Sequence, residues 1–182
     1  TRYLSEPRSG LWYHGWTFLD RHHYAEAFWA RGNAWITVAI PEFIDLMGDH
    51  LDAGVRRYFT QVVARQVRSL CELQADNGMW HTVLDDPYSP QESSATAGIA
   101  YGMLRCVRLG LLDEATIEPA LRAARAVWQR IDGDGIVLEA SKGTMVGHDH
   151  QYYCDIAMAP VPYAQALTML LLLELEQGQW LA

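Results

Sequence analysis

Five stretches of the chain carry the spacing of apolar residues that is typical of α-helices. In residues 53–74 and 114–131, apolar side chains recur every three or four positions, while charged and polar side chains fill the other face. Three further stretches are apolar on nearly every side: 34–47, 93–109 and 162–175. The pattern predicts an all-α fold in which buried and amphipathic helices alternate, with Pro41 kinking the first buried helix.

A Gly-rich connector precedes each of the three apolar helices, and the three connectors resemble one another. They read SGLWYHGW at Gly10, NGMWHTVL at Gly78 and DGIVLEAS at Gly135. The glycines are 68 (78 − 10) and 57 (135 − 78) residues apart, and a repeat of this size built from helix pairs is typical of an α/α toroid. We expect an inner ring of apolar helices, an outer ring of amphipathic helices, and all connectors on one rim.

Composition limits the classes of function. The 182 residues fit one domain, and half of them are apolar. The net charge of −8 leaves no basic surface for phosphates, so we expect no nucleic-acid partner. The longest apolar run, residues 167–175, is too short to span a bilayer, so we expect no membrane partner. Three cysteines without a CxxC pair indicate free thiols in a reducing compartment, so we expect a cytoplasmic protein.

The loops before the apolar helices gather aromatic, charged and hydroxyl side chains that suit a sugar site. Indole faces stack on pyranose rings, and an arginine pairs with a carboxylate through two parallel hydrogen bonds. The pattern therefore favours an acidic sugar held by an arginine beside an aromatic wall. The candidates of the three units are His14, Trp16, His22, His23, Trp29, Arg31 and Asn33; His81, Asp85, Asp86, Glu92, Ser93 and Ser94; and Lys142, Thr144, His148, Asp149, His150, Tyr152, Tyr153 and Gln165.

Several aromatic and acidic residues also have a purely structural interpretation. Trp12 and Trp80 are suited to fix the connectors on the core, Asp85 and Asp86 before a proline to form a turn, and Glu92 to begin a helix. The histidine motifs HH and HDH have neither HExxH spacing nor a cysteine partner, so we expect no metal and no cofactor. The chain has no GxSxG elbow, which disfavours a serine hydrolase triad.

The segment FWARGNAW, residues 28–35, leads from a loop into the first apolar helix. Residues two positions apart on a regular helix diverge by about 200°, so Trp29 and Arg31 can converge only if the helix begins after them. We expect it to begin near Gly32, which relaxes the backbone. Trp29 and Arg31 should then project into the ring centre beside His14, with Trp35 packed behind them in the core.

Six segments resemble, in order, the C-terminal half of the unsaturated rhamnogalacturonyl hydrolases: GLWYHGW, FWARGNAW, GMWHTVLDDP, ESSATAGIAYGMLRCVRLG, GTMVG and VPYAQAL. These enzymes form glycoside hydrolase family 105, which is related to the family 88 unsaturated glucuronyl hydrolases. The resemblance implies an (α/α)6 barrel that removes a 4,5-unsaturated uronic acid from pectin-derived rhamnogalacturonan oligosaccharides by hydrating the C4–C5 double bond. An aspartate serves as general acid and base. The resemblance also implies that Trp29 stacks on the unsaturated ring, while His14 and Arg31 hold polar groups of the uronate.

The chain departs from the family in its motifs and its length. The catalytic aspartate of the family lies in an upstream W-x-D motif, and none of the seven tryptophans here is followed two positions later by Asp. We therefore expect the main catalytic aspartate outside this chain, with Asp20 as the nearby substitute. Family chains are also much longer, which predicts that residues 1–182 form a single incomplete toroid domain, about half a barrel with roughly three helical pairs.

Half a toroid leaves inner helices without neighbours along two open edges, and large apolar patches of this kind usually mark a contact surface. We expect these edges to be covered by a missing N-terminal half or by a second copy of the chain. Two other functions stay open. One is a non-catalytic half-barrel module that binds a partner chain or a sugar. The other is an isomerase or epimerase with His14, His81 and His148 as its acid and base residues.

Overall fold

The computed structural model describes residues 2–143 and 145–180, which fold into helices joined by long loops. These residues contain isolated β-bridges but no strand of a sheet, so the all-α prediction is confirmed. The elements are α1 (Ala30–Met47), η1 (Gly48–His50), α2 (Ala53–Glu72), α3 (Ser93–Arg108), η2 (Glu114–Thr116), α4 (Ile117–Trp128), α5 (His150–Cys154) and α6 (Pro162–Gln177). All five predicted helices are present, whereas the short α5 was not predicted.

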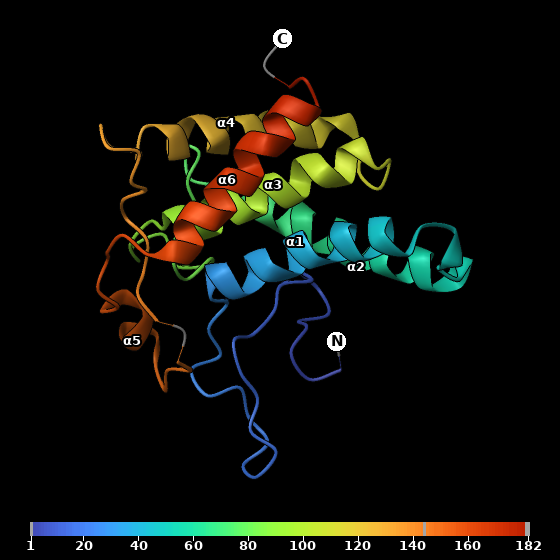
Figure 1. Cartoon of the computed structure of the whole chain (residues 1–182). Helices are drawn as coiled ribbons and strands as arrows, with labels where there is room; N and C mark the ends of the chain where they lie inside the picture. Colours follow the sequence, from blue (N-terminus) through green and yellow to red (C-terminus); the bar gives the residue numbers. More distant parts are fainter. Residues whose placement is uncertain (1, 144, 181–182) are drawn as a thin grey trace.

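Helices α1, α3 and α6 lie side by side, with α3 in the middle (Figure 1). Glycines on α3 allow the close approach: a Cβ atom at Gly98 would meet both Ala34 of α1 and Leu167 of α6. At Gly102 a Cβ atom would lie 2.4 Å from the carbonyl oxygen of Thr37, so α1 and α3 touch there through their backbones. The apolar helices therefore form one layer, as their burial pattern predicts.

The three helices of this layer run in the same direction. In the first turns of α1 and α6, the guanidinium of Arg31 lies 4.4 Å from the centre of the Tyr163 ring, and Arg31 also pairs with Glu92, the N-cap of α3. In the last turns, Arg105 of α3 pairs with Asp45 of α1. The loops that precede α1, α3 and α6 consequently meet at one end of the molecule.

The amphipathic helices α2 and α4 pack behind α1 and α3. Two connector glycines touch them: a Cβ atom at Gly10 would collide with Arg65 of α2, and one at Gly78 with the Arg122 backbone of α4. Gly135, the third connector glycine, also has a positive φ, but a Cβ atom there would meet nothing within 4 Å. Within the described residues the third unit thus has no second helix, and the chain contains two helix pairs and the single helix α6 instead of three pairs.

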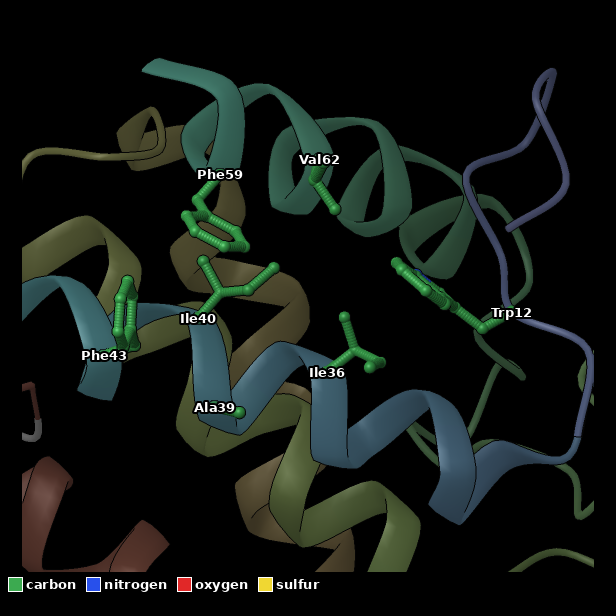
Figure 2. Close-up of a pocket in the computed structure, with 7 residues that line it drawn as sticks. All are labelled: Trp12, Ile36, Ala39, Ile40, Phe43, Phe59 and Val62. Atoms are coloured by element: carbon green, nitrogen blue, oxygen red, sulfur yellow. The ribbon is translucent and has the colours of Figure 1, made fainter. Parts of the chain in front are cut away.

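The outer flanks of the layer carry apolar grooves. Figure 2 shows the groove between α1 and α2, about 320 Å³, where side chains of the two helices face each other beside Trp12. A second groove of about 420 Å³ lies between α4 and α6. Its apolar lining residues are Leu121, Ala124, Trp128, Leu172 and Leu175. Trp128 is 65% exposed, so this flank presents a large apolar surface to solvent.

The interior explains how the connectors are fixed. Trp80 is wholly buried and its indole N–H donates to the Leu70 carbonyl of α2 at 2.8 Å, as expected for a core residue. Trp12 is only half-buried, because it lies at the mouth of the α1–α2 groove. The three cysteines are free thiols. No helix in the described part of the chain is long and apolar enough to cross a membrane.

Candidate functional site

An asparagine on α1 holds the first connector in place. Asn33 accepts a hydrogen bond from the Trp12 amide at 2.8 Å and donates to the Trp12 carbonyl at 2.9 Å. Gln66 of α2 in turn donates to the Asn33 carbonyl at 3.0 Å. Because Asn33 pairs with both backbone groups of Trp12, the extended chain is fixed two residues before His14. Asn33, one of the candidates from sequence, therefore has a structural task.

Trp29 is the N-cap of α1 and has an extended backbone, with ψ of 123°. The helix begins at Ala30, so the predicted start near Gly32 is wrong by one half-turn. Gly32 instead leaves room for an aromatic ring, since a Cβ atom there would lie 3.3 Å from Cε3 of Trp29. Trp29 and Arg31 still converge, because Trp29 itself is outside the helix.

The expectation that Trp35 packs in the core is wrong, since its side chain is 44% exposed. The face of α1 that meets α3 consists of small residues such as Ala34 and Thr37, which permit the close contact at Gly102. A tryptophan is too large for that interface, so it lies on the flank of α1. Trp35 comes one helical turn after Arg31 and thus on nearly the same side of the helix.

Arg31 is only 1% exposed, and its guanidinium has five hydrogen-bond contacts. Its Nη1 lies within hydrogen-bonding distance of Glu92 (3.3 Å), the Ser94 hydroxyl (3.1 Å), and the carbonyl and hydroxyl oxygens of Ser141 (both 2.9 Å). Nη2 donates to the Gly143 carbonyl. Arg31 therefore ties α1 to the start of α3 and to the loop before α6.

The Arg31 guanidinium also lies over two aromatic rings, 4.5 Å from Trp29 and 4.4 Å from Tyr163. Burial lowers the pKa of Arg31, and the charge of Glu92 opposes this shift. Two buried donors of this stack have no acceptor within the described residues: Nε of Arg31 and Nε1 of Trp29. Buried N–H groups are almost always paired, so these two mark a place where an acceptor is expected.

His14 completes the stack. Its ring lies 4.4 Å from the Trp29 ring, and its Nδ1 is 2.8 Å from the hydroxyl of Tyr153. Burial, and secondarily the positive charge of Arg31, lowers the pKa of His14 to about 4. The imidazole is therefore neutral at ordinary pH. The structure thus brings His14, Trp29 and Arg31 into contact, the three residues that the sequence selected.

Two acidic candidates have the structural roles expected from the sequence. The Glu92 carboxylate accepts hydrogen bonds from the amides of Ser94 and Ala95 and caps α3, and it also accepts from the Ser141 amide at 2.9 Å. Asp86 forms the predicted turn by accepting from the Tyr88 amide at 3.0 Å. Both carboxylates thus accept hydrogen bonds from backbone amides and stabilise the local fold.

The other candidates make separate local contacts. Nδ1 of His81 contacts the Ser89 carbonyl, whereas the ring of His148 packs against Tyr24 at 5.5 Å. Asp20 lies in an exposed turn, where its amide donates to the Thr17 hydroxyl. Among the described residues no three His, Cys, Asp or Glu side chains gather as metal ligands would. Thr144 lies outside the described residues.

Two residues of the site escaped sequence analysis, Ser141 and Tyr163. The Ser141 carbonyl accepts hydrogen bonds from both Arg31 and the Tyr163 hydroxyl, the latter at 2.6 Å. A signal for Tyr163 was available, because it is the only aromatic residue at the start of the apolar helix 162–175. Ser141 offered none, since nothing in the sequence relates it to a residue 110 positions away.

Comparison with known proteins identifies relatives of nearly the whole chain. Residues 1–179 match the family model described as Glycosyl Hydrolase Family 88. The chain is 30% identical over 159 residues to the unsaturated rhamnogalacturonyl hydrolase YesR of Bacillus subtilis, an alignment that covers 84% of this chain and 42% of the relative.

Solved structures agree with the sequence relatives. A "possible member of GH105 family" from Salmonella enterica superimposes with a TM-score of 0.94 at 41% identity, over 98% of this chain and 47% of that one. A similarly described protein from Klebsiella pneumoniae superimposes with a TM-score of 0.93 at 42% identity, with the same coverage of both chains. The chain thus spans less than half the length of these relatives.

Proposed function

The chain belongs to glycosyl hydrolase family 88, and from this membership we propose that the protein removes a 4,5-unsaturated uronic acid from rhamnogalacturonan oligosaccharides by hydrating the C4–C5 double bond. The relative YesR carries the name of that activity. Because the chain covers less than half of the named relative, the activity is proposed for the complete protein. The cytoplasm is the proposed location, which the three free thiols support.

The unpaired donors of the Arg31–Trp29 stack carry the proposal. A buried guanidinium with a free Nε–H, beside an indole N–H that also has no acceptor, is suited to the oxygens of a carboxylate. Arg31 stacks on the Trp29 ring at 4.5 Å and is itself almost inaccessible, so its charge acts on a uronate partly through space. His14 adds a neutral donor or acceptor at the edge of the same stack.

The sugar ring needs an open aromatic face, and Trp35 offers one. Trp29 was proposed for this stacking, yet it is 3% exposed and in contact with both His14 and Arg31. Trp35 has 44% of its surface free and follows Arg31 by one helical turn. We propose that Trp29 orients the binding residues and that Trp35 contributes the exposed stacking surface.

The principal acid and base residue is proposed to lie outside these 182 residues. The carboxylate that touches the stack, Glu92, is engaged by Arg31, Ser94, Ala95 and the Ser141 amide. A general base needs a free lone pair within reach of the reacting proton. Glu92 has no such capacity, and Asp20 sits in an exposed turn.

The activity test follows the double bond itself. The complete protein is incubated with an unsaturated rhamnogalacturonan disaccharide, and hydration is measured as loss of the ultraviolet absorbance of the conjugated double bond. We expect loss of absorbance, and a fall in kcat/KM of about tenfold or more for His14→Gln, since one hydrogen bond to substrate is removed. His50→Gln, which changes an exposed histidine of η1 after the last turn of α1, is the matched control.

Each alternative gives a different result in this assay. Binding of the disaccharide without loss of absorbance would favour the non-catalytic module. A rearranged uronate that keeps its double bond would favour the isomerase. Faster turnover of an unsaturated glucuronyl disaccharide from a glycosaminoglycan would contradict the rhamnogalacturonan assignment and keep the family activity.

We further propose that a helix from outside these residues covers the groove between α4 and α6. In the first two units the second helix touches the connector glycine, Gly10 or Gly78, whereas Gly135 has an open space at the equivalent position. A second copy of the chain would add the same unpaired helix again, so it fits this groove less well than an additional amphipathic helix.

Sedimentation velocity tests the assembly proposal. We expect the 182-residue chain to self-associate weakly or aggregate through its apolar flanks, and Trp128→Glu with Leu172→Glu to suppress that association. We expect the complete protein to sediment as a monomer with the groove filled. A discrete, stable dimer of the 182-residue chain would favour a second copy as the occupant.

A further inference from the structure

Tyr153 lies on the short helix α5, and its hydroxyl is 2.8 Å from Nδ1 of His14. The side chain is 1% exposed and packs with Trp29 and Val83. Asp149 fixes the start of α5 by accepting a hydrogen bond from the backbone at 2.8 Å. The fold thus brings a buried phenol to one nitrogen of the histidine in the candidate site.

The hydrogen bonds around the phenol have a defined direction. The Gly147 amide lies 3.1 Å from the Tyr153 oxygen, and an amide can only donate. This bond uses a lone pair of the phenol oxygen and leaves its proton for another partner. Within the described residues that partner is Nδ1 of His14. If His14 donated instead, the buried phenol proton would have no acceptor, an arrangement that folded proteins avoid.

Both rings are neutral in the folded protein. Burial raises the pKa of the Tyr153 phenol, although the Gly147 amide opposes the shift. Burial and the charge of Arg31 lower the pKa of His14 to about 4. A neutral imidazole carries a single proton, so when Nδ1 accepts a hydrogen bond the proton must be on Nε2.

We infer that Tyr153 is a positioning residue that holds His14 in the Nε2–H tautomer and thereby presents an N–H donor to a substrate oxygen. That the oxygen belongs to a uronate rests on the proposed function, whereas the tautomer follows from the contacts of Tyr153 alone. A fixed Nε2–H cannot accept a proton at that nitrogen. His14 would therefore hold and orient the sugar, which disfavours it as the base of an isomerase.

Nuclear magnetic resonance reads the tautomer directly. Long-range ¹H–¹⁵N correlation spectra of the protein near neutral pH show which nitrogen of each histidine carries the proton, and the His14→Gln variant identifies the His14 signals. We expect the proton on Nε2. Tyr153→Phe keeps the ring and removes the hydroxyl, so its His14 should change to a mixture of the two tautomers.

Tyr152→Phe is the matched control, because it removes the adjacent hydroxyl and leaves the contact with His14 intact. Its spectrum should equal that of the unsubstituted protein. A His14 proton on Nδ1 in the unsubstituted protein, or an unchanged tautomer in a folded Tyr153→Phe, would overturn the inference. If Tyr153→Phe does not fold, the spectrum of the unsubstituted protein decides alone.

Kinetics on an unsaturated uronide give the functional readout. We expect Tyr153→Phe to lower kcat/KM in proportion to the fraction of His14 that leaves the Nε2–H tautomer, about twofold for an equal mixture, and Tyr152→Phe to leave it unchanged. Equal kcat/KM values for the two variants would contradict a positioning role. An unsubstituted protein without activity contradicts the proposed function, and the tautomer spectra still decide the inference.

Discussion

The layer of α1, α3 and α6 is joined at both ends by arginine–carboxylate contacts, and the two ends differ in kind. At the end where the helices begin, Arg31 and Glu92 are each 1% exposed. At the other end, Arg105 pairs with Glu42 at 3.1 Å and with Asp45 at 2.6 Å, and both carboxylates are about half exposed. The same helices are therefore linked once by a wholly buried pair and once, at the end that we call the surface end, by a network whose α1 carboxylates reach solvent, although Glu174 of α6 is only 2% exposed.

The two ends also differ in how completely their donors are used. Arg108, beside Arg105, forms two parallel hydrogen bonds of 2.7 Å with Glu174, so the surface end has the geometry of a finished ion pair. Nη1 of Arg31 has more acceptor oxygens within reach than it has protons, whereas Nε of the same guanidinium has no acceptor within the described residues. Buried donors are almost always paired, so the unpaired Nε of Arg31 is the reason to consider this end as a candidate site.

The largest expected effect is that of removing the buried charge. Arg31→Met keeps a long apolar side chain but leaves Glu92 ionised and without its partner, at a cost of about 3–5 kcal/mol in the free energy of unfolding. Urea unfolding at neutral pH measures this loss. Adding Glu92→Gln should recover part of it, because the uncompensated charge is then removed. A double variant as unstable as the single one would mean that the loss comes from packing.

Acid should affect the two ends in opposite directions. The pKa of His14, beside Arg31 and Tyr153, is lowered to about 4, so the unfolded chain takes up the proton first. Stability is complete above the ordinary pKa of 6.5 and falls between pH 6.5 and 4, by up to about 3 kcal/mol. Burial raises the pKa of Glu174, which faces Arg105, Arg108 and Glu42. Its protonation therefore adds stability as the pH falls.

Urea unfolding between pH 7 and pH 4 separates these contributions. His14→Gln should lose less stability on acidification than the unsubstituted protein, and Glu174→Gln should lose more. Glu6, whose pKa is lowered to about 2, affects a lower range, since its contribution is lost only below pH 4.5. An acid response that neither variant alters would remove this distinction between the ends.

The smallest effect is expected at the surface end. Arg105→Met leaves Glu42 and Asp45 in contact with water and leaves Glu174 with Arg108, so the loss should be about 1 kcal/mol and should shrink in high salt. The measurement is the urea midpoint at two ionic strengths, with Arg31→Met as reference. A loss as large as that of Arg31→Met, independent of salt, would show that the two ends are equivalent.

Helices were predictable from sequence because their signal is local. Apolar spacing predicted the first residue of α2, and the ends of α3 and α6 to within two residues. The substrate-binding role that the family resemblance implies for Arg31 stays a prediction. The partners of Arg31 were not predictable, since Ser141 and Tyr163 come close only after folding. The prediction that Trp35 packs in the core was wrong for a similar reason. Its exposure depends on how closely α1 packs against the glycines of α3, which lie far away in the sequence.

The contact of Thr37 with Gly102 lies between the two ends and belongs to neither. The backbones of α1 and α3 touch at this point, so the contact sets the distance and the angle between the two helices. A methyl group at this position, as in Gly102→Ala, would push the two helices apart and change their angle. Because helices are stiff, the change would displace both Arg31 on α1 and Arg105 on α3. The geometry of the candidate site would then depend on the absence of a side chain at Gly102, a position remote from Arg31 on the same helix pair.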